Sequence, residues 1–552
     1  MFLIFISILI GGTMKKIFTK TVLTGATAIV VYLMVMNFVL HMAVNSKYGL
    51  FFDEYYYYSM SSHLSFGYLD APPITGWLMA LSRLLLGDSI PAMHVFPALS
   101  GSFAMLFAAF TARRMGGGRL SQVLTALAIM LAPVFMTFSG MFTYDTFDQL
   151  MSAILIFQTA KILKGAATHR TWVLLGFIAG IGLMVKITMG FLLVCLVIGM
   201  LLTHARKYLA SKWFFISIAI AAACFVPFVV WQAVNGFPIF EYLLAYKAAR
   251  TASPTAIDLL QYVFVVMNPA NVLLWLGGLV MLFTKRGRVF RPFAWAFLAY
   301  FTLSAVFSVR FYALAGVLLP LVAFGSVCFE NNFRNAPLHL SQAGNTEPQA
   351  SPKKKRKLSW TLKVCYIVVL CLLGAALTPV SIPLLSPEDT ADYNEAIGYS
   401  EHVGWDTIIF TGIPTFFAGR LGWNELAKSI ADVYHSLPEE DQKDCTIYCS
   451  LYGAVGAIDY YGKQYSLPPA ISASLGAYYW GYNGYDGKCA ICVNMGDDIY
   501  LTLKNFFEDV QTYPGSDAVP YSTLSLVDRT IYVCRGLKMP ASEFWQLLRS
   551  AT

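Results

Sequence analysis

The residues best suited to chemistry lie together in one aromatic segment, roughly residues 46–89. It opens with Asp53 and Glu54, continues through four consecutive tyrosines (55–58) and closes at Asp70, before two prolines. A carboxylate in such a place can accept a proton from an attacking hydroxyl. The acidic pair alone would equally suit a solvated helix end, and the tyrosines an aromatic belt at a membrane interface. The segment therefore predicts a site in which one of the acidic residues could accept a proton, and the simpler explanations stay open.

Further polar residues interrupt apolar stretches of the chain. Asp145 and Asp148 stand at the start of one stretch, Lys186 ends another, and Arg310 lies between two more. Cations can bind phosphate while a carboxylate takes the proton of a hydroxyl, so this combination suits a lipid substrate that carries phosphate. For Lys186 alone, a side chain that reaches to the membrane interface is an equal explanation.

The elements that must position these residues are membrane spans. The chain is 57% hydrophobic and only 13% charged, with a mean hydropathy of +0.59. A soluble domain carries about a quarter charged residues. We predict about eleven spans, at 21–44, 90–112, 119–138, 146–163, 172–186, 188–203, 213–231, 262–283, 293–308, 311–329 and 360–384. The two stretches around Lys186 are short, and they could be two tilted helices or one broken helix.

The loop cations alternate between the two sides of these spans. One side receives the clusters near residues 15–20, 113–119, 161–170, 206–212, 285–291 and 353–357, and the other keeps only scattered cations. By the positive-inside rule the N-terminus is cytoplasmic, and the segment with Asp53 lies outside. The net charge of +8 belongs to these clusters, so we expect no nucleic-acid partner. We expect translation to start at Met14 and leave residues 1–13 out of the fold.

Two regions follow the tenth stretch. Residues 331–359 are polar and basic, which is typical of a flexible cytoplasmic linker. Residues 386–552 have the mixed composition of an extracytoplasmic α/β domain, with strands expected at 446–450 and 490–493 and helices at 423–435 and 500–510. Five cysteines lie there. The Cys489-Ala-Ile-Cys492 spacing could be a redox motif or half a zinc site, but without a second pair disulfides are the better interpretation.

Several short motifs follow one another in a specific order. They are Asp53-Glu54 with the run Gly67 to Pro73 and Trp77, Thr143-Tyr144-Asp145, Gly182 to Lys186, Trp231-Gln232 with Asn235 to Pro238, Asn268-Pro269, and Arg310-Phe311-Tyr312 with Pro320. Over about residues 45–330 this order resembles the bacterial membrane glycosyltransferases of the protein O-mannosyltransferase superfamily, which includes the aminoarabinose transferase of lipid A. Two positions depart from the pattern. Ala71 stands where His or Lys is frequent, which removes a phosphate or substrate contact, and Tyr144 replaces a proline.

The resemblance implies the C-type glycosyltransferase fold: a polytopic α-helical membrane domain (1–385) in the bacterial inner membrane, with a soluble α/β domain after it. It implies transfer of a sugar from a polyprenyl phosphate to a hydroxyl of a protein, glycolipid or polysaccharide on the outer face, with inversion. Asp53 would be the catalytic base. The residues expected to bind or shape the substrates are Glu54, Tyr57, Asp70, Asp145, Lys186, Arg310 and Tyr312. Mg²⁺ or Mn²⁺ would suit the oxygens of Asp53, Glu54 and Asp70, although nothing in the sequence requires a metal.

Two alternatives to a single-sugar transferase remain. A transporter or flippase of lipid-linked saccharide would also use intramembrane charges, although it usually has internal repeats, and none is clear here. A polymerase or ligase that moves a whole glycan cannot be separated by sequence. The outer domain could bind the acceptor or simply cap the catalytic loops.

Overall fold

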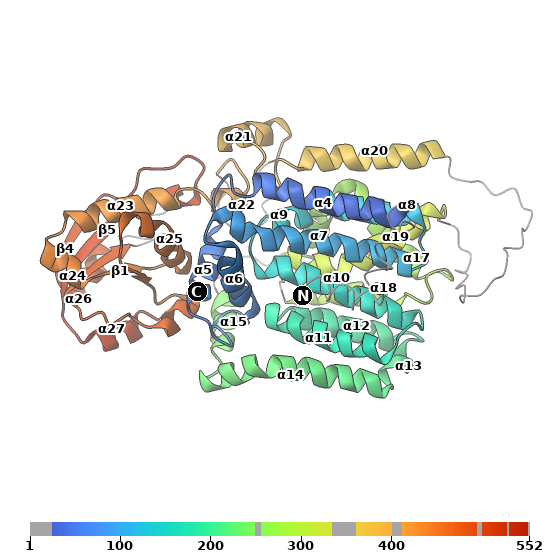
Figure 1. The fold of residues 1–552 in the computed structure, drawn as a ribbon, viewed down its shortest axis with the longest axis horizontal. Coiled ribbons are helices and arrows are strands. Elements are labelled where there is room, and N and C mark those ends of the chain that lie inside the picture. The colour runs from blue at the N-terminus through green and yellow to red at the C-terminus, as the bar shows by residue number, and fades with distance from the viewer. Residues whose placement is uncertain are drawn as a thin grey trace, which may run out of the picture.

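The computed structural model describes residues 25–248, 255–307, 309–333, 360–399, 411–493, 499–526 and 529–549. The expected start at Met14, most of the expected linker and the basic run at 353–357 lie outside these residues. Figure 1 shows a bundle of roughly parallel helices joined to a smaller sheet-containing domain formed by the C-terminal region. Short helices, among them α5 (Phe52–Ser62), α6 (Ile74–Leu86) and α15 (Pro238–Ala248), lie between the two.

Every stretch predicted to span contains a helix. The bundle consists of α4 (Ala26–Val44), α7 (Ile90–Arg114), α8 (Arg119–Met130), α9 (Pro133–Ser139), α10 (Tyr144–Leu163), α11 (His169–Val185), α12 (Met189–Leu201), α14 (Lys212–Val234), α16 (Ala256–Val266), α17 (Val272–Leu282), α18 (Pro292–Val306), α19 (Ala315–Glu330) and α20 (Trp360–Leu377). Lys186 takes an extended backbone between α11 and α12, which are therefore two separate helices.

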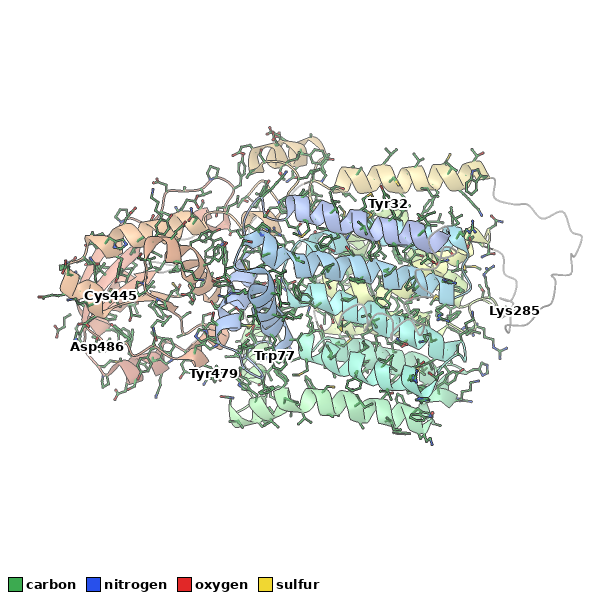
Figure 2. All side chains as sticks on the ribbon, viewed as in Figure 1. Tyr32, Trp77, Lys285, Cys445, Tyr479 and Asp486 are labelled. Atoms are coloured by element: carbon green, nitrogen blue, oxygen red, sulfur yellow. The ribbon has the colours of Figure 1, made fainter. Side chains whose placement is uncertain are left out.

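By length and composition, five helices of the described chain could cross a membrane, and up to seven if each of two bent pairs counts as one span. The pairs are α8 with α9, bent by 65°, and α16 with the helix from Pro269 to Leu282, bent by 108°. Helices α11, α12 and α18 are apolar but shorter. Figure 2 places Lys285 at the end of the bundle away from the domain that holds Cys445. The chain is a multi-pass membrane protein.

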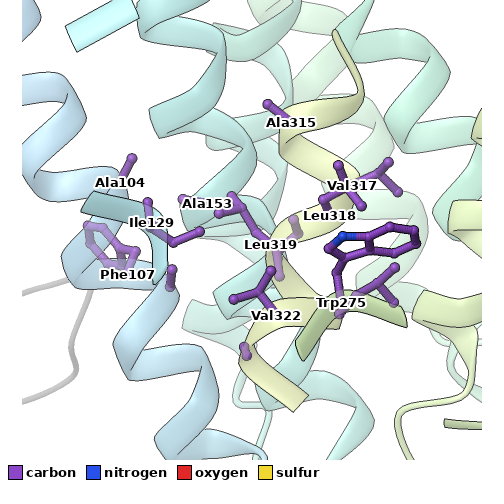
Figure 3. Packing of buried hydrophobic residues seen from close by; sticks show 14 of the residues in the cluster. Ala104, Phe107, Ile129, Ala153, Trp275, Ala315, Val317, Leu318, Leu319 and Val322 are labelled. Atoms are coloured by element: carbon purple, nitrogen blue, oxygen red, sulfur yellow. The ribbon is translucent and has the colours of Figure 1, made fainter. Parts of the chain in front are cut away.

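The helices of the bundle pack closely against one another. Figure 3 shows Phe107 of α7, Ile129 of α8, Trp275 of α17 and Leu319 of α19 meeting in one apolar cluster, and all four are buried. Helices α17 and α19 approach so closely that a Cβ on Gly325 would lie 1.9 Å from a backbone oxygen of α17. Small residues permit such contact between spanning helices, where dispersion forces provide much of the attraction.

The C-terminal domain contains a mixed five-stranded sheet of order β2-β1-β3-β5-β4. Strands β1 (Cys445–Cys449), β2 (Ala470–Ile471) and β3 (Cys489–Val493) are parallel, and β5 (Ile531–Leu537) is antiparallel to β3 and β4 (Phe507–Tyr513). Helices α23 (Trp423–Ser436), α25 (Tyr452–Tyr461), α26 (Tyr500–Phe506) and α27 (Ala541–Leu547) accompany it. Both predicted strands and the helix at 423–435 are confirmed.

Two local predictions for this domain are wrong. The helix expected at 500–510 ends at Phe506, and the chain continues as β4 because β5 offers it a pairing edge. The five cysteines of the domain are all free. Cys445 and Cys489 face each other in register on neighbouring strands, with 2.9 Å between their sulfurs. Cys492 is three positions after Cys489 on a strand and so points to the opposite face, which argues against a shared metal or redox pair.

The C-terminal region is docked firmly onto the bundle. Arg420 is buried and donates to the backbone oxygens of Asn45 (3.1 Å) and Gly140 (3.0 Å), at the end of α4 and before α10. Helix α25 packs directly on α5, where a Cβ on Gly456 would lie 1.9 Å from the oxygen of Tyr55. The first loop is thus enclosed between the bundle and the C-terminal domain.

Candidate active site

Helix α5 begins with the acidic pair, and the two carboxylates have different surroundings. Glu54 is fully buried, and its oxygens accept from the N–H of Phe51 (2.7 Å) and of Phe142 (2.5 Å) and lie 3.0 Å from the His94 ring. Burial alone would raise the pKa of Glu54, but His94, Arg420 and these bonds hold it below the usual value. The structure therefore places Glu54 behind the site, where it fixes α5 to the bundle.

Asp53, one residue earlier, is only partly buried and faces the C-terminal domain. Its Oδ1 accepts a hydrogen bond of 2.8 Å from the hydroxyl of Tyr452, the first residue of α25. Burial raises the pKa of Asp53 to about 6, opposed by the Tyr452 bond and by Arg310, and assisted by Asp70 and Asp145. A carboxylate with this pKa is ionised at neutral pH and is more basic than an ordinary aspartate, as a general base requires.

Asp70 is the second partly buried carboxylate of the site. Its Oδ1 accepts from the hydroxyl of Tyr56 at 2.7 Å, and that hydroxyl in turn accepts from the N–H of Gly476 in the C-terminal domain at 3.0 Å. Burial raises the pKa of Asp70 to about 6. Asp53 and Asp70 each accept a hydrogen bond from a tyrosine hydroxyl. Tyr452 belongs to the C-terminal domain, and Tyr56 is bonded to Gly476 of that domain.

The cations come from the bundle. Lys186 pairs with Asp145, and its ammonium lies 4.7 Å from the ring centre of Tyr144 and 5.3 Å from that of Tyr312. The break between α11 and α12 brings Lys186 to this end of the bundle. Arg310 precedes the short helix Phe311–Leu314, and its Nε donates to the Tyr246 hydroxyl at 2.6 Å.

The structure brings most of the predicted residues into one site. Arg310, Asp70 and Asp145 each act electrostatically on Asp53. Tyr57 is buried, with its ring 5.9 Å from that of Tyr144 in an edge-on contact. Carboxylates and cations therefore lie together between α5, the junction of α11 and α12 at Lys186, and the segment before α19.

Sequence reasoning missed Tyr246 and Tyr452, and it noted Tyr56 only as part of the run of four tyrosines. Tyr452 lies 399 positions from Asp53 in the chain, and no local pattern marks it. Tyr144 was noticed only as a departure from a motif, whereas its ring contacts the ammonium of Lys186.

The predicted set of three carboxylates does not fit a metal ion well. Glu54 is occupied by two N–H groups and His94, which leaves Asp53 and Asp70, each already bound to a tyrosine hydroxyl. Among the residues that the structure describes, no three His, Cys, Asp or Glu side chains gather as metal ligands. A divalent cation stays an untested prediction, and no step of the proposed reaction depends on one.

The chain resembles known proteins both in part of its sequence and in its fold. Residues 70–231 match the family model of dolichyl-phosphate-mannose-protein mannosyltransferases. The structure of ArnT from Cupriavidus metallidurans in the apo state aligns with a TM-score of 0.57 at 14% identity, covering 91% of this chain and 97% of that chain. The structure of ArnT bound to undecaprenyl phosphate gives 0.56 at 15% identity, with the same coverage. No curated protein matches the sequence.

The family match and the shared fold together support a membrane glycosyltransferase. The family match covers residues 70–231, which include Asp70, Asp145 and Lys186. The shared fold extends over nearly the whole chain, including the C-terminal domain. The chain thus has the C-type glycosyltransferase fold, and its resemblance to the protein O-mannosyltransferase and aminoarabinose transferase superfamily is confirmed.

Proposed function

We propose that this protein transfers a sugar from a polyprenyl-phosphate donor to a hydroxyl acceptor at the outer face of the bacterial inner membrane. The observation that carries the proposal is a basic carboxylate, Asp53, that interacts electrostatically with Arg310 and with Asp145, the ion-pair partner of Lys186, at one end of a spanning bundle. The binding of undecaprenyl phosphate by ArnT, which shares the fold, supports a donor of this type.

The reaction is a single displacement with inversion. The acceptor hydroxyl attacks the anomeric carbon while Asp53 takes its proton, a role that contributes about 10²–10⁴-fold. The bond between the anomeric carbon and the phosphate oxygen breaks, and its electron pair leaves with the polyprenyl phosphate. Lys186 and Arg310 stabilise the charge that develops on this phosphate.

The other site residues position these groups. Asp145 holds the ammonium of Lys186, and the rings of Tyr144 and Tyr312 lie beside it. Tyr57 packs under this cluster. Asp70 lies near enough to Asp53 to raise its proton affinity and is held by Tyr56. Glu54 contributes by fixing α5, without touching the substrate.

The domain boundary and topology belong to the same proposal. We place the membrane domain at residues 1–385 and the extracytoplasmic domain at 386–552, with the N-terminus cytoplasmic. Lys47 and Tyr48 bind the backbone oxygens of Leu384 and Leu385, so the junction is attached to the first loop. The hydrogen bond from Tyr452 to Asp53 favours a domain that caps the catalytic loop over one that only recruits an acceptor. The acceptor itself is a protein, a glycolipid or a polysaccharide.

The test is turnover of a panel of radiolabelled polyprenyl-phosphate sugars by the purified enzyme in lipid, with and without candidate acceptors. Asp53→Asn should lower turnover of the accepted donor by about 10²–10⁴-fold while leaving the melting temperature close to that of the wild type. The control is Asp432→Asn, an exposed position on α23. If Asp53→Asn is as active as the wild type, the assigned base is wrong. If no donor turns over, a transporter of lipid-linked saccharide becomes the better explanation.

A further inference from the structure

A hollow of about 420 Å³ lies between the first loop and the C-terminal domain, apart from the Asp53 site. Tyr58, His63 and Arg83 line it from the loop, and Asp459, Lys463 and Trp480 line it from the C-terminal domain. Its size is within the range of small-molecule sites, and it combines apolar surface with a few polar groups, as such sites do.

The walls of the hollow are held in place by backbone contact. A Cβ on Gly453 would lie 2.7 Å from the oxygen of Phe52, and one on Gly456 would lie 1.9 Å from that of Tyr55. Helices α25 and α5 therefore meet without intervening side chains. On the other wall, Arg83 donates to Ser61 (2.5 Å) and Ser62 (3.0 Å), which fixes the end of α5 against α6. The hollow is thus formed before any ligand arrives.

The cations of the hollow are already neutralised. Arg83 and Lys463 both pair with Asp88, at 2.6 and 2.8 Å, and Lys463 also donates to the Tyr58 hydroxyl at 2.6 Å. These partners hold the pKa of Asp88 at about 2 against the effect of its partial burial, so Asp88 stays ionised. With Asp459 also ionised above pH 6, the two cations that line the hollow are matched by two carboxylates, Asp459 in its wall and Asp88 as their shared ion-pair partner. An anion would gain little here, and a neutral ligand would meet no unbalanced charge.

The remaining polar groups suit a ligand rich in hydroxyls. Asp459 uses one oxygen for the N–H of Ala470 at 3.0 Å, and a carboxylate can accept further hydrogen bonds. The Nδ1 of His63 lies 3.0 Å from the carbonyl oxygen of Ser59, which can only accept, so the neutral ring has its proton there and Nε2 is an acceptor. Trp480 stacks on this ring at 4.5 Å and adds a flat apolar wall.

The hollow also shares a wall with the active site. Trp480 contacts the ring of Tyr56 at 6.0 Å, and Tyr56 donates its hydroxyl to Asp70. We propose that the hollow binds a neutral sugar unit of the acceptor, so that the accepted substrate is a glycan held between the first loop and the C-terminal domain. This inference rests on the proposed glycosyl transfer. The donor does not fit here, because its phosphate needs the cations at Lys186 and Arg310.

The test measures saccharide binding directly on the full-length enzyme in lipid nanodiscs. Saturation-transfer NMR is recorded with neutral methyl-capped disaccharides of glucose, mannose and galactose, and with glucuronic acid and glucose 6-phosphate. We expect signals from at least one neutral disaccharide and weaker ones from the anions. Asp459→Asn, which keeps an acceptor for Ala470, and His63→Ala should each lower this signal about tenfold. Asp432→Asn, at an exposed position on α23, should leave it unchanged.

Three results would overturn the inference. They are no signal from any neutral disaccharide on the wild type, a signal in Asp459→Asn and His63→Ala as strong as in the wild type, or a stronger signal from the anions than from the neutral disaccharides. Hydrolysis of the donor without acceptor, recorded on the same samples, tests the proposed function separately. Donor hydrolysis without saccharide binding would refute the proposed acceptor site and leave the proposed transfer standing. Saccharide binding without donor turnover would refute the proposed sugar transfer, and with it the proposal that the hollow binds the acceptor of that transfer.

Discussion

Removal of the Tyr452 hydroxyl tests whether the C-terminal domain lowers the pKa of Asp53, the proposed catalytic base. In Tyr452→Phe the ring stays while Asp53 loses the hydrogen bond of 2.8 Å that lowers its pKa. The pKa of Asp53, about 6 in the intact protein, must therefore rise further. Because only the ionised carboxylate can accept the proton, activity is present above this pKa and is lost as pH falls through it.

The expected shift follows from the energy of the bond. A hydrogen bond to a charged group contributes about 1.5–3 kcal/mol, and one pKa unit corresponds to about 1.4 kcal/mol. We take the lower end, because Asp53 is partly exposed and water replaces part of the lost bond. The pKa then moves by about one unit, to about 7. At pH 6 the ionised fraction falls from about one half to about one tenth, whereas at pH 8 it stays near nine tenths.

The assay is donor turnover from pH 5 to 9 by the reconstituted enzyme. We expect a loss of about fivefold at pH 6, little change at pH 8 and an acidic limb displaced by about one unit. The matched control is Tyr461→Phe, because Tyr461 is on the same helix and bonds across the same interface to Tyr55 at 3.2 Å, away from Asp53. An unmoved acidic limb in Tyr452→Phe, or an equal displacement in Tyr461→Phe, would refute the reasoning.

Three further predictions concern stability and charge. Glu54→Gln should lower the melting temperature strongly, since loss of one partner of a buried charged contact costs about 3–5 kcal/mol, and His94 with two N–H groups would lose the carboxylate. Lys186→Met should lower donor turnover about 10²–10³-fold, because the leaving phosphate loses a cation. Gly456→Ala should loosen the C-terminal domain, since its Cβ would meet the backbone of α5, and limited proteolysis should cleave that domain faster.

Each of these has a matched control. Glu440→Gln removes an exposed carboxylate and should leave the melting temperature unchanged. Lys186→Arg keeps the positive charge and should retain more activity than Lys186→Met. Gly190→Ala adds a methyl group that makes only an ordinary contact at 3.6 Å, so proteolysis should not accelerate. A stable Glu54→Gln, a fully active Lys186→Met or a protease-resistant Gly456→Ala would contradict the corresponding argument.

The helices of the bundle could be predicted because their signal is local. A span needs a run of apolar residues long enough to cross the bilayer, and each such run can be found without knowledge of its neighbours. The same local reasoning located the strands at Cys445–Cys449 and Cys489–Val493. It failed at residues 507–513, where a helical pattern at Tyr500 continues into a strand because β5 supplies the hydrogen bonds.

The site was only partly accessible to this reasoning. The sequence marked Asp53, Asp70, Lys186 and Arg310 as unusual, because charged residues next to a membrane need a partner or a task. Their roles stay predictions until they are measured. The residue types alone could not distinguish Asp53 from Glu54, and only the resemblance to a family singled out Asp53 as the base.

By itself, the sequence determined the membrane class of the protein and most of its helices, and it marked the loop in which we propose the active site, because hydrophobicity and charge act residue by residue. The tertiary structure decided what each carboxylate can do. It placed groups from two distant segments, Phe142 and His94, around Glu54 and left Asp53 beside Tyr452 of the C-terminal domain. It also formed the hollow between α5 and α25. Contacts across hundreds of residues depend on how elements pack, and packing leaves no local pattern in the chain.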